Sequence, residues 1–474
     1  MCRRDGDSGG GSDGRSGTSG SGGGGEGQGA GFAPRPGTGL TRRDLLRASP
    51  RPGTGLTRRD LLRASAGAGG ALAFSSWFGG LARAAGLEPG VARAATADAV
   101  VLVWLAGGPS HLDTFDPKSL PAVAGATRAV DTALPGVRFA DKLPLLAARA
   151  KRLAVIRSLR HTSGEHDRGT YYAHTGYVPV AATAHPSVGA VLAHERPGAD
   201  SAIPSYVTIG GTPRGAGFLG SAVEPFALAD PLAPPSFLRP PLRVDAARGA
   251  ARLALLDALD GPAAAARPGT PVAEHVVFTR RAAATSGGPF PAALDLAAEP
   301  DAARDRYGRD GFGASCLMAR RLVQSGVRAV EISLPGWDTH EDNFARTGLL
   351  AGLLDRGLAA LLDDLDARKL LARTLVVCMG EFGRTPEINA RGGREHHPGA
   401  YCALLFGGGV RPGTVVGRTD DRGNAVVERP VSVPDLLATI YVAAGVDPDR
   451  TFYTPGGRPI DVAPDGAPIA ELVG

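Results

Sequence analysis

Lysine and cysteine are scarce in this chain of 474 residues, and long apolar runs are missing from its body. Four residues are Lys, so nearly all of the 52 basic residues are Arg. The four cysteines (Cys2, Cys316, Cys378 and Cys402) show no C-x-x-C spacing, which excludes a zinc ribbon and a thioredoxin motif. A disulfide framework is not expected in a chain of this size. The body has no stretch of 18 apolar residues, which excludes a polytopic membrane protein.

The excess of positive charge is confined to the N-terminal part. Residues 1–96 hold 13 Arg and 7 acidic residues, which leaves 39 basic and 40 acidic residues in 97–474. Residues 97–474 are nearly neutral and lack the excess of positive charge that binds nucleic acid, so we expect no nucleic-acid partner. With 43% hydrophobic and 21% charged residues, the chain can build a sizeable core, and wholesale disorder is excluded.

The first 96 residues are predicted to direct the protein to its destination rather than to fold into a domain. Residues 1–33 form a Gly-rich tail, with 13 Gly in the first 30 positions, that we expect to be disordered. The sequence PRPGTGLTRRDLLRAS occurs at 34–49 and again, unchanged, at 50–65. The second copy continues into the apolar segment 66–82 and two ARA sequences, the order typical of a secretory signal.

The segment TRRDLLR at 57–63 resembles a twin-arginine (Tat) signal, because an Arg pair, a Leu pair and an apolar region follow in that order. The resemblance implies export of the folded protein by the Tat translocase to the periplasm or out of the cell. No stable membrane span is expected in the mature protein, since the apolar segment is short and Gly-rich. An uncleaved basic N-terminal helix is the alternative.

From residue 97 onward, strand and helix signals alternate. Short apolar runs closed by turn residues are typical of buried parallel strands, and they occur at 98–105, 153–156, 206–209, 327–334, 374–379 and 401–406. Helical periodicity occurs at 168–174, 186–194, 247–259, 307–325, 347–367 and 433–444. The alternation predicts an α/β fold in which helices cover both faces of a mostly parallel sheet. Residues 211–300, rich in Pro, Gly and Ala, are predicted to be an insertion or cap region.

Polar residues gather next to the predicted strands, mostly where the strands end. There are five such segments, GGPSHLDTFD (107–116), RHTSGEHDRG (160–169), PGWDTH (335–340), GEFGRTP (380–386) and GREHHP (393–398), and six of the ten His lie in four of them. In open α/β sheets, sites form at the carboxyl ends of strands. Converging imidazoles and carboxylates are ligands for a divalent metal, and the mixture favours Zn or Mn over an all-oxygen Ca site. No H-E-x-x-H spacing occurs, so distant segments would have to assemble the site.

Six segments in order resemble the DUF1501 family: LAGGPSHLDTFDPK, HTSGEHDRG, GWDTHEDN, TLVVCMGEFGRTPEIN, GREHHPGAY and GGGVRPGTVVGRTD. The resemblance covers most of residues 97–450. That family is exported through Tat signals and is similar to the alkaline phosphatase/sulfatase superfamily. The resemblance implies a three-layer α/β/α sandwich, alkaline-phosphatase-like, with one or two metal ions beside a phosphate or sulfate ester site.

The resemblance also implies roles for single residues. The implied metal ligands are Asp113, Asp338, His340, Glu381, and His396 or His397. The implied catalytic candidates are Arg168 or Arg384, which would hold two oxygens of a tetrahedral anion, Ser163 or the neighbouring Thr162 as nucleophile, and His166 as a ligand or acid/base.

Each of these residues also has a structural alternative. Asp113, Asp338 and Ser163 are common capping residues. Glu381 can form an ion pair with Arg384. The His candidates can lie in a surface loop, or pack under the loop at the start of a helix.

The chain departs from the superfamily pattern at two points. Phe382 stands where the superfamily has a His after the acidic ligand, which puts the second metal in doubt. No C-x-P-S-R sequence is present, so a formylglycine sulfatase is not expected. We expect an exported metal-dependent hydrolase of a phosphate or sulfate ester, acting on a small anionic substrate. The alternative is a non-catalytic exported metal-binding or surface-interaction protein with the same fold, so the sequence leaves enzymatic activity open.

Overall fold

The computed structural model describes residues 94–200, 202–233, 235, 238, 244–267 and 269–473. The Gly-rich tail, the repeated 16-residue segment and the Tat-like signal lie outside the described residues. Within the described ranges, every helix is too short or too polar to cross a bilayer.

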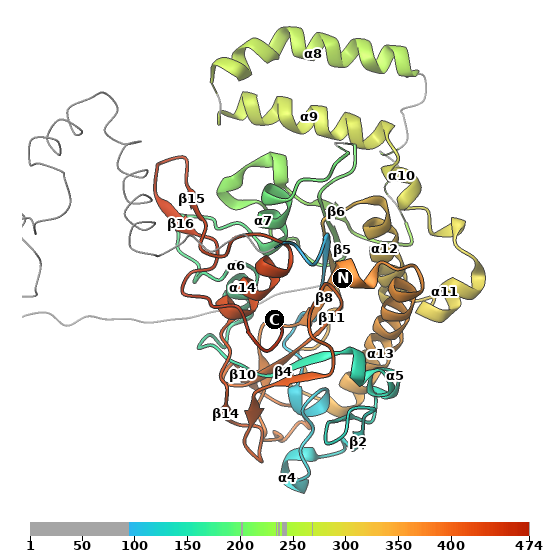
Figure 1. Cartoon of the computed structure of the whole chain (residues 1–474), viewed down its shortest axis with the longest axis vertical. Helices are drawn as coiled ribbons and strands as arrows, with labels where there is room; N and C mark the ends of the chain where they lie inside the picture. The colour runs from blue at the N-terminus through green and yellow to red at the C-terminus, as the bar shows by residue number, and fades with distance from the viewer. Residues whose placement is uncertain are drawn as a thin grey trace, which may run out of the picture. The chain divides into compact units, whose positions relative to one another are not determined.

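An eight-stranded sheet is the central element of the described part (Figure 1). Its strands follow the order β12-β4-β11-β8-β1-β7-β5-β6, and all run parallel except β11, which is antiparallel to both neighbours. The strands are β1 (Ala99–Trp104), β4 (Ala154–Leu159), β5 (Tyr206–Ile209), β6 (Phe226–Leu228), β7 (Ala329–Ser333), β8 (Thr374–Met379), β11 (Tyr401–Phe406) and β12 (Thr414–Val416).

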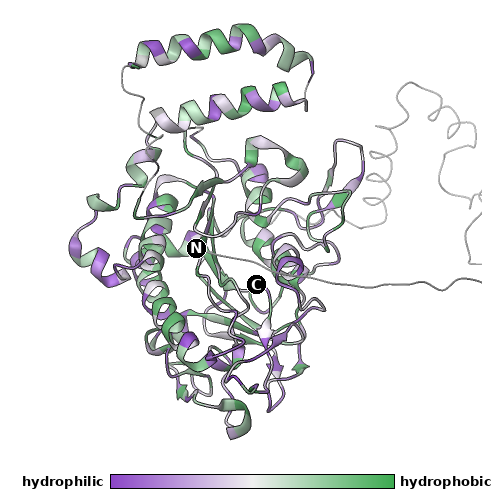
Figure 2. Ribbon diagram, turned by 180° about the vertical axis from the view of Figure 1, so that it is seen from behind, coloured by the Kyte–Doolittle hydropathy of each residue, from purple (hydrophilic) through white to green (hydrophobic). Residues whose placement is uncertain are grey.

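Helices cover both faces of this sheet, because alternate side chains of its central strands enter two separate cores. Val101 and Val103 of β1 belong to one core, and Val100 and Leu102 to the other. The first core is closed by α5 (Pro144–Ala148), α10 (Phe290–Ala293), α11 (Asp301–Tyr307), α12 (Gly311–Ser325) and α13 (Asn343–Ala367). The second is closed by α6 (His166–Thr175), α7 (Val188–Glu195) and α14 (Val433–Ala443). Figure 2 shows apolar residues throughout the central sheet. The predicted α/β/α sandwich with a mostly parallel sheet is therefore confirmed.

Short elements decorate the edges of the sandwich. Four two-stranded ribbons pair β2 (Ala129–Asp131) with β3 (Arg138–Ala140), β9 (Gly383–Arg384) with β10 (His396–His397), β13 (Arg418–Thr419) with β14 (Val426–Glu428), and β15 (Thr451–Tyr453) with β16 (Pro459–Asp461). The remaining short helices are α4 (Pro121–Ala124) and the 3₁₀ turns η1 (His111–Asp113), η2 (Ala150–Arg152), η3 (Gly217–Leu219), η4 (Ser221–Val223), η6 (Leu296–Ala298) and η7 (Leu371–Arg373).

Two regions differ from the expected pattern. The predicted helix 307–325 begins later, as α12 at Gly311, because Tyr307 ends α11 and Gly308 adopts φ +105 after it. Asp310 then caps α12 by accepting from the backbone N–H of Gly313. The predicted cap region 211–300 contributes β6 to the edge of the sheet. It also contains a pair of long helices, α8 (Ala246–Ala266) and α9 (Pro271–Gly287), which lie side by side (Figure 1).

A buried histidine follows the first strand. His111, at the start of η1, lies within hydrogen-bond distance of the Gly423 carbonyl through Nε2 (2.8 Å), and its Nδ1 is buried without a partner. Burial lowers the pKa of His111 from 6.5 to about 4. The folded state therefore keeps this ring neutral at pH values where the unfolded chain takes up a proton.

His111 predicts a loss of stability in acid. Between pH 6.5 and 4 the unfolded state binds the extra proton, so the free energy of unfolding falls as pH falls through this window. From this group alone we expect about 2 kcal/mol less stability at pH 5 than at pH 7. Urea unfolding at several pH values should show a shallower pH dependence for His111→Gln than for the wild type. Equal slopes would contradict the prediction.

Candidate metal centre

Three loops that follow neighbouring strands meet at the carboxyl edge of the sheet. Gly107 follows β1, Asp338 follows β7 and Glu381 follows β8, and β1 pairs in parallel with both other strands. The ribbon β9–β10 joins them from the loop after β8, and its register pairs His396 with Arg384. The mostly parallel topology is what brings these distant segments together.

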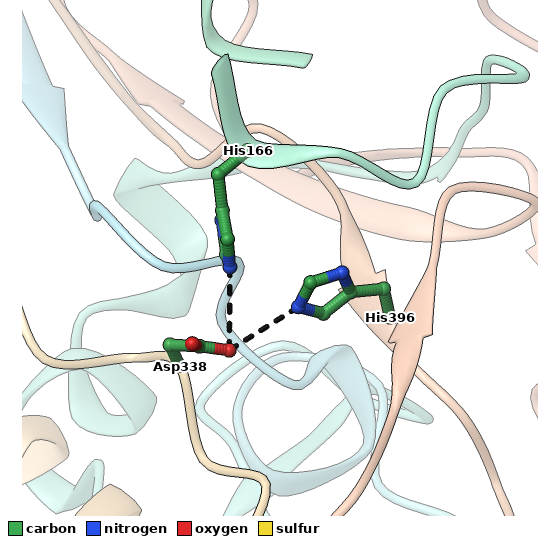
Figure 3. Close-up of side chains that lie close together, drawn as sticks. All are labelled: His166, Asp338 and His396. Carbon is green, nitrogen blue, oxygen red and sulfur yellow. Dashed lines mark hydrogen bonds and ion pairs between the residues drawn. The ribbon is translucent and has the colours of Figure 1, made fainter. Parts of the chain in front are cut away.

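Four side chains converge there, and we call them the His–Asp cluster: His166, Asp338, His340 and His396. Asp338 Oδ1 lies 3.0 Å from His340 Nε2, 3.2 Å from His396 Nε2 and 3.3 Å from His166 Nε2. The two nitrogens His340 Nε2 and His396 Nε2 are 2.9 Å apart. Figure 3 shows His166 and His396 pointing at the same side of Asp338.

Each ring in the cluster is held by an acceptor at its other nitrogen. His166 Nδ1 lies 2.6 Å from Glu381 Oε1, and His340 Nδ1 lies 2.6 Å from Glu395 Oε2. His396 Nδ1 lies 2.6 Å from the carbonyl of Gly164. Carbonyl and carboxylate oxygens accept, so each Nδ1 carries a proton, and in a neutral ring the Nε2 lone pair is then the one that faces Asp338. Such outer acceptors are typical of metal-binding histidines.

The unpaired atoms of the site fit a cation. His166 Nε2 is buried and has no hydrogen-bond partner, and the same holds for Glu381 Oε2. Lone pairs on three nitrogens directed at one carboxylate oxygen repel one another unless a positive charge lies between them. Ligands bound tetrahedrally to Zn²⁺ at about 2.0–2.2 Å lie about 3.3–3.6 Å apart. The ligand atoms of His166, Asp338 and His396 all lie within 4.8 Å of one another, and Asp338 Oδ1 is 3.3 Å from His166 Nε2 and 3.2 Å from His396 Nε2. His340 Nε2 adjoins Asp338 and His396 in this group. The residues therefore fit a divalent metal.

Charge and burial around the cluster favour the ligand forms of Asp338 and His396, whereas Glu381 favours the protonated form of His166, whose proton a metal would have to displace. Burial opposes the negative charge of Asp338. The hydrogen bond from Arg384 Nη2 (2.6 Å), the charge of Arg384 and the neighbouring His396 and His166 together outweigh it and hold the pKa of Asp338 well below its usual range. Burial lowers the pKa of His396, which keeps that ring neutral. The hydrogen bond to Glu381 raises the pKa of His166. The side chain of Asp338 is 45% exposed, so the cluster is open to solvent on that side.

The structure gathers four of the predicted site residues and places Glu381 directly behind them. Asp338, His340, His396 and His166 form the cluster. Glu381 is buried, and it accepts from His166 and from the backbone N–H of Gly107 (2.9 Å). It therefore supports a ligand in this structure.

Asp113 lies elsewhere. Its carboxylate is buried and accepts from Arg394 Nε (2.8 Å), Asn343 Nδ2 (2.9 Å) and the Ser110 hydroxyl (2.6 Å), and also from the Thr127 hydroxyl. All of its neighbours are donors, so in this structure it balances the charge of Arg394 instead of facing the cluster.

The other predicted site residues also lie outside the cluster. His397, the next residue after His396, turns the other way, and its Nε2 lies 2.7 Å from the carbonyl of Asn424. Arg384 is fully buried, and its guanidinium donates to three backbone carbonyls and to Asp338. These bonds use four of its five N–H donors, so it cannot hold two oxygens of a substrate anion. Ser163 and Arg168 line a cavity of about 450 Å³, together with Thr162. No hydroxyl group contacts the cluster side chains in the described part of the chain.

Sequence reasoning missed the residues that hold the cluster in place. Glu395 fixes His340, and Arg394 anchors the turn between β9 and β10 by donating to the carbonyls of Thr385 and Pro386. Glu395 lies in GREHHP, directly before the two histidines, and this adjacency is the only sequence signal that could have pointed to it. The Phe382 ring packs against His166 (centroids 5.0 Å apart) and His396 (4.6 Å), so this residue forms an apolar wall of the site.

The fold and the site define an α/β/α protein with a candidate metal centre at the carboxyl edge of its sheet. The chain belongs to the family described as "Protein of unknown function (DUF1501)", whose sequence model matches residues 97–473. The family assignment made from the motifs is confirmed. No curated protein matches this sequence.

Several solved structures are similar to the chain at low identity. The PsFucS1 sulfatase from Pseudoalteromonas sp. is 12% identical, with a TM-score of 0.34 over 82% of this chain and 72% of that one. The C-terminal periplasmic domain of EcEptC from Escherichia coli, in complex with Zn, is 12% identical, with a TM-score of 0.35 over 75% and 84%. The alkaline phosphatase from the Antarctic bacterium TAB5 is 11% identical, with a TM-score of 0.30 over 66% and 91%.

The buried pair of Arg394 and Asp113 gives a testable prediction on stability. Arg394→Met leaves the Asp113 carboxylate buried without its cation, which should cost about 3–5 kcal/mol of unfolding free energy. Arg418→Met, which breaks the exposed pair with Glu428, is the control and should change little. Urea unfolding of the full chain measures both. Similar losses in the two variants would show that burial of the Arg394 pair is not decisive.

Proposed function

We propose that the protein is an exported, metal-dependent hydrolase of a phosphate or sulfate ester, which it reaches in the periplasm or outside the cell through the Tat translocase. The observation that carries the proposal is the His–Asp cluster, in which three Nε2 atoms face one carboxylate oxygen and each ring has its own Nδ1 acceptor. The Tat-like segment supports export.

Asp338, His340, His396 and His166 would hold one divalent ion. Three imidazoles and one carboxylate favour Zn²⁺, with Mn²⁺ the less suited choice for so many nitrogen ligands. When bound, the ion supplies a Lewis acid that polarises an ester oxygen. Asp113, predicted from the resemblance to be a ligand, pairs with Arg394, so the proposal is for one ion.

The chain's own residues would orient the site and receive the substrate. Glu381 and Glu395 fix the tautomers of His166 and His340, and Arg384 keeps Asp338 ionised and in place. Solvent reaches the cluster past Asp338, which leaves room for a small anionic ester. Arg168, exposed beside Ser163 in the neighbouring cavity, is the basic residue that we propose for binding the anion.

A non-catalytic, exported metal-binding protein is the second candidate. Four protein ligands are enough to complete a tetrahedral zinc site, as in structural centres. In addition, neither the Ser163 nor the Thr162 hydroxyl is hydrogen-bonded to the cluster, so the nucleophile that the resemblance implies is not in position. Turnover distinguishes the two candidates.

Metal content tests the site itself. The full-length wild type, reconstituted with Zn²⁺ and measured by elemental mass spectrometry, should carry about one ion per chain. His396→Ala should lose stoichiometric metal, because it removes one of four ligands. His397→Ala is the matched control on the next residue and should keep it, since that ring faces Asn424. Metal loss in both variants, or none in either, would contradict the ligand assignment.

Ester turnover tests the reaction. The Zn-loaded wild type and His397→Ala should release p-nitrophenol from p-nitrophenyl phosphate or p-nitrophenyl sulfate. His340→Ala should lose at least about 100-fold in rate while keeping its fold, because the Lewis acid is no longer held. A metal-loaded wild type without turnover on either ester would favour the binding protein.

A further inference from the structure

A second polar network is buried in the core on the α6 side of the sheet. Glu331 of β7 accepts a hydrogen bond from the Tyr206 hydroxyl of β5 at 2.9 Å. Its other oxygen lies 3.3 Å from His174 Nε2 of α6. All three side chains are buried, and the residues around them are apolar. None of the three is a ligand or an Nδ1 acceptor of the His–Asp cluster.

The network joins α6, which begins with the cluster residue His166, to β7, whose following loop carries Asp338. His174 lies eight residues after His166 on α6, which is about 12 Å along the helix. Glu331 lies on β7, seven residues before Asp338. The segment between is anchored, because the backbone N–H groups of Leu334 and the buried Trp337 donate to Trp104 at the end of β1 and to Ala106 in the loop after it. A shift of α6 along β7 would therefore change the Glu331 contact and the separation of His166 from Asp338 together.

Packing around the network leaves little freedom. The His174 ring lies against the Trp104 ring at the end of β1, with centroids 4.3 Å apart. A Cβ on Gly189 would lie 2.4 Å from the Tyr206 ring, so α7 presses directly on that ring. Burial raises the pKa of Tyr206 well above its ordinary value, which keeps the hydroxyl a donor.

The polar contacts between α6, β5 and β7 define the position of the helix on the sheet, which apolar contacts would not do. A buried carboxylate costs free energy unless its partners are in place, whereas well-packed apolar residues would stabilise the core at least as well. Hydrogen bonds are directional and short-ranged, so they define the position of the helix on the strand, while apolar surfaces can slide.

We propose that Glu331, His174 and Tyr206 are positioning residues of the metal centre, which hold α6 on β7 so that His166 Nε2 faces Asp338 Oδ1. The inference rests on the proposed metal site. According to this inference, the three buried residues contribute to metal affinity as well as to the stability of the core.

A matched pair of Tyr→Phe variants tests the inference. The Tyr307 hydroxyl donates to Asp364 at 3.1 Å in the core on the opposite face of the sheet. Tyr206→Phe and Tyr307→Phe thus remove the same kind of buried hydrogen bond, and only the first is tied to α6 and β7. We expect Tyr206→Phe to weaken Zn²⁺ binding about tenfold and Tyr307→Phe to change it less than twofold. The Zn²⁺ Kd of the full chain is measured by competition with a chromogenic chelator.

The visible spectrum of the Co²⁺-loaded protein gives a readout that stability alone does not move. Tyr206→Phe should shift the Co²⁺ absorption bands, and Tyr307→Phe should leave them as in the wild type. Glu331→Gln, which keeps the shape and an acceptor for Tyr206, should fall between Tyr206→Phe and the wild type in Kd, and it replaces Tyr206→Phe if that variant does not fold. Wild-type Kd and spectrum in both Tyr206→Phe and Glu331→Gln would overturn the inference and leave the metal site standing. A wild type that binds no metal would overturn the proposed function and, with it, this inference.

Discussion

The guanidinium of Arg384 is the constraint on which the site depends. It is fully buried, and a buried charge is tolerated only when its donors are satisfied. They are satisfied by the carbonyls of Gly107, Gly108 and Arg394 and by the carboxylate of Asp338. These partners belong to the loops after β1, β7 and β8. One side chain therefore ties together the three loops that form the candidate metal centre, and it sets the orientation of Asp338, the carboxylate that all three histidines face.

Around this tie, the histidines are oriented by a layer of acceptors rather than by one another. Glu381, Glu395 and the Gly164 carbonyl each take one Nδ1 proton, so the ring positions follow from backbone and carboxylate placement in three separate loops. Phe382 fills the space beside two of the rings. The residue that breaks the superfamily pattern thus has a packing function here, which agrees with the proposal of one ion instead of two.

The sequence predicted more of the fold than of the site. Buried strands are recognised in the sequence as continuous apolar runs, and β5, β8 and β11 have the predicted bounds. Of the residues that we expected to be ligands, Asp338, His340 and His396 converge, but Asp113 does not. Spacing along the chain could not separate them, because a carboxylate after a strand looks the same whether it faces a metal or a buried arginine. Neighbouring histidines raise the same problem, since adjacent side chains in a ribbon point to opposite faces.

The sequence by itself determined the sandwich, the family, and the strand ends where the chemistry gathers. These follow from local patterns: apolar runs, turn residues and motifs that stay in order along the chain. Tertiary structure alone decided that Asp113 pairs with Arg394 and Asp338 with Arg384, and which nitrogen of each cluster histidine faces Asp338. It also decided that Arg384 binds backbone carbonyls and Asp338 instead of a substrate. Those outcomes depend on contacts between residues more than 40 positions apart, and distances of that kind are set by how the strands are ordered in the sheet, which no local pattern encodes.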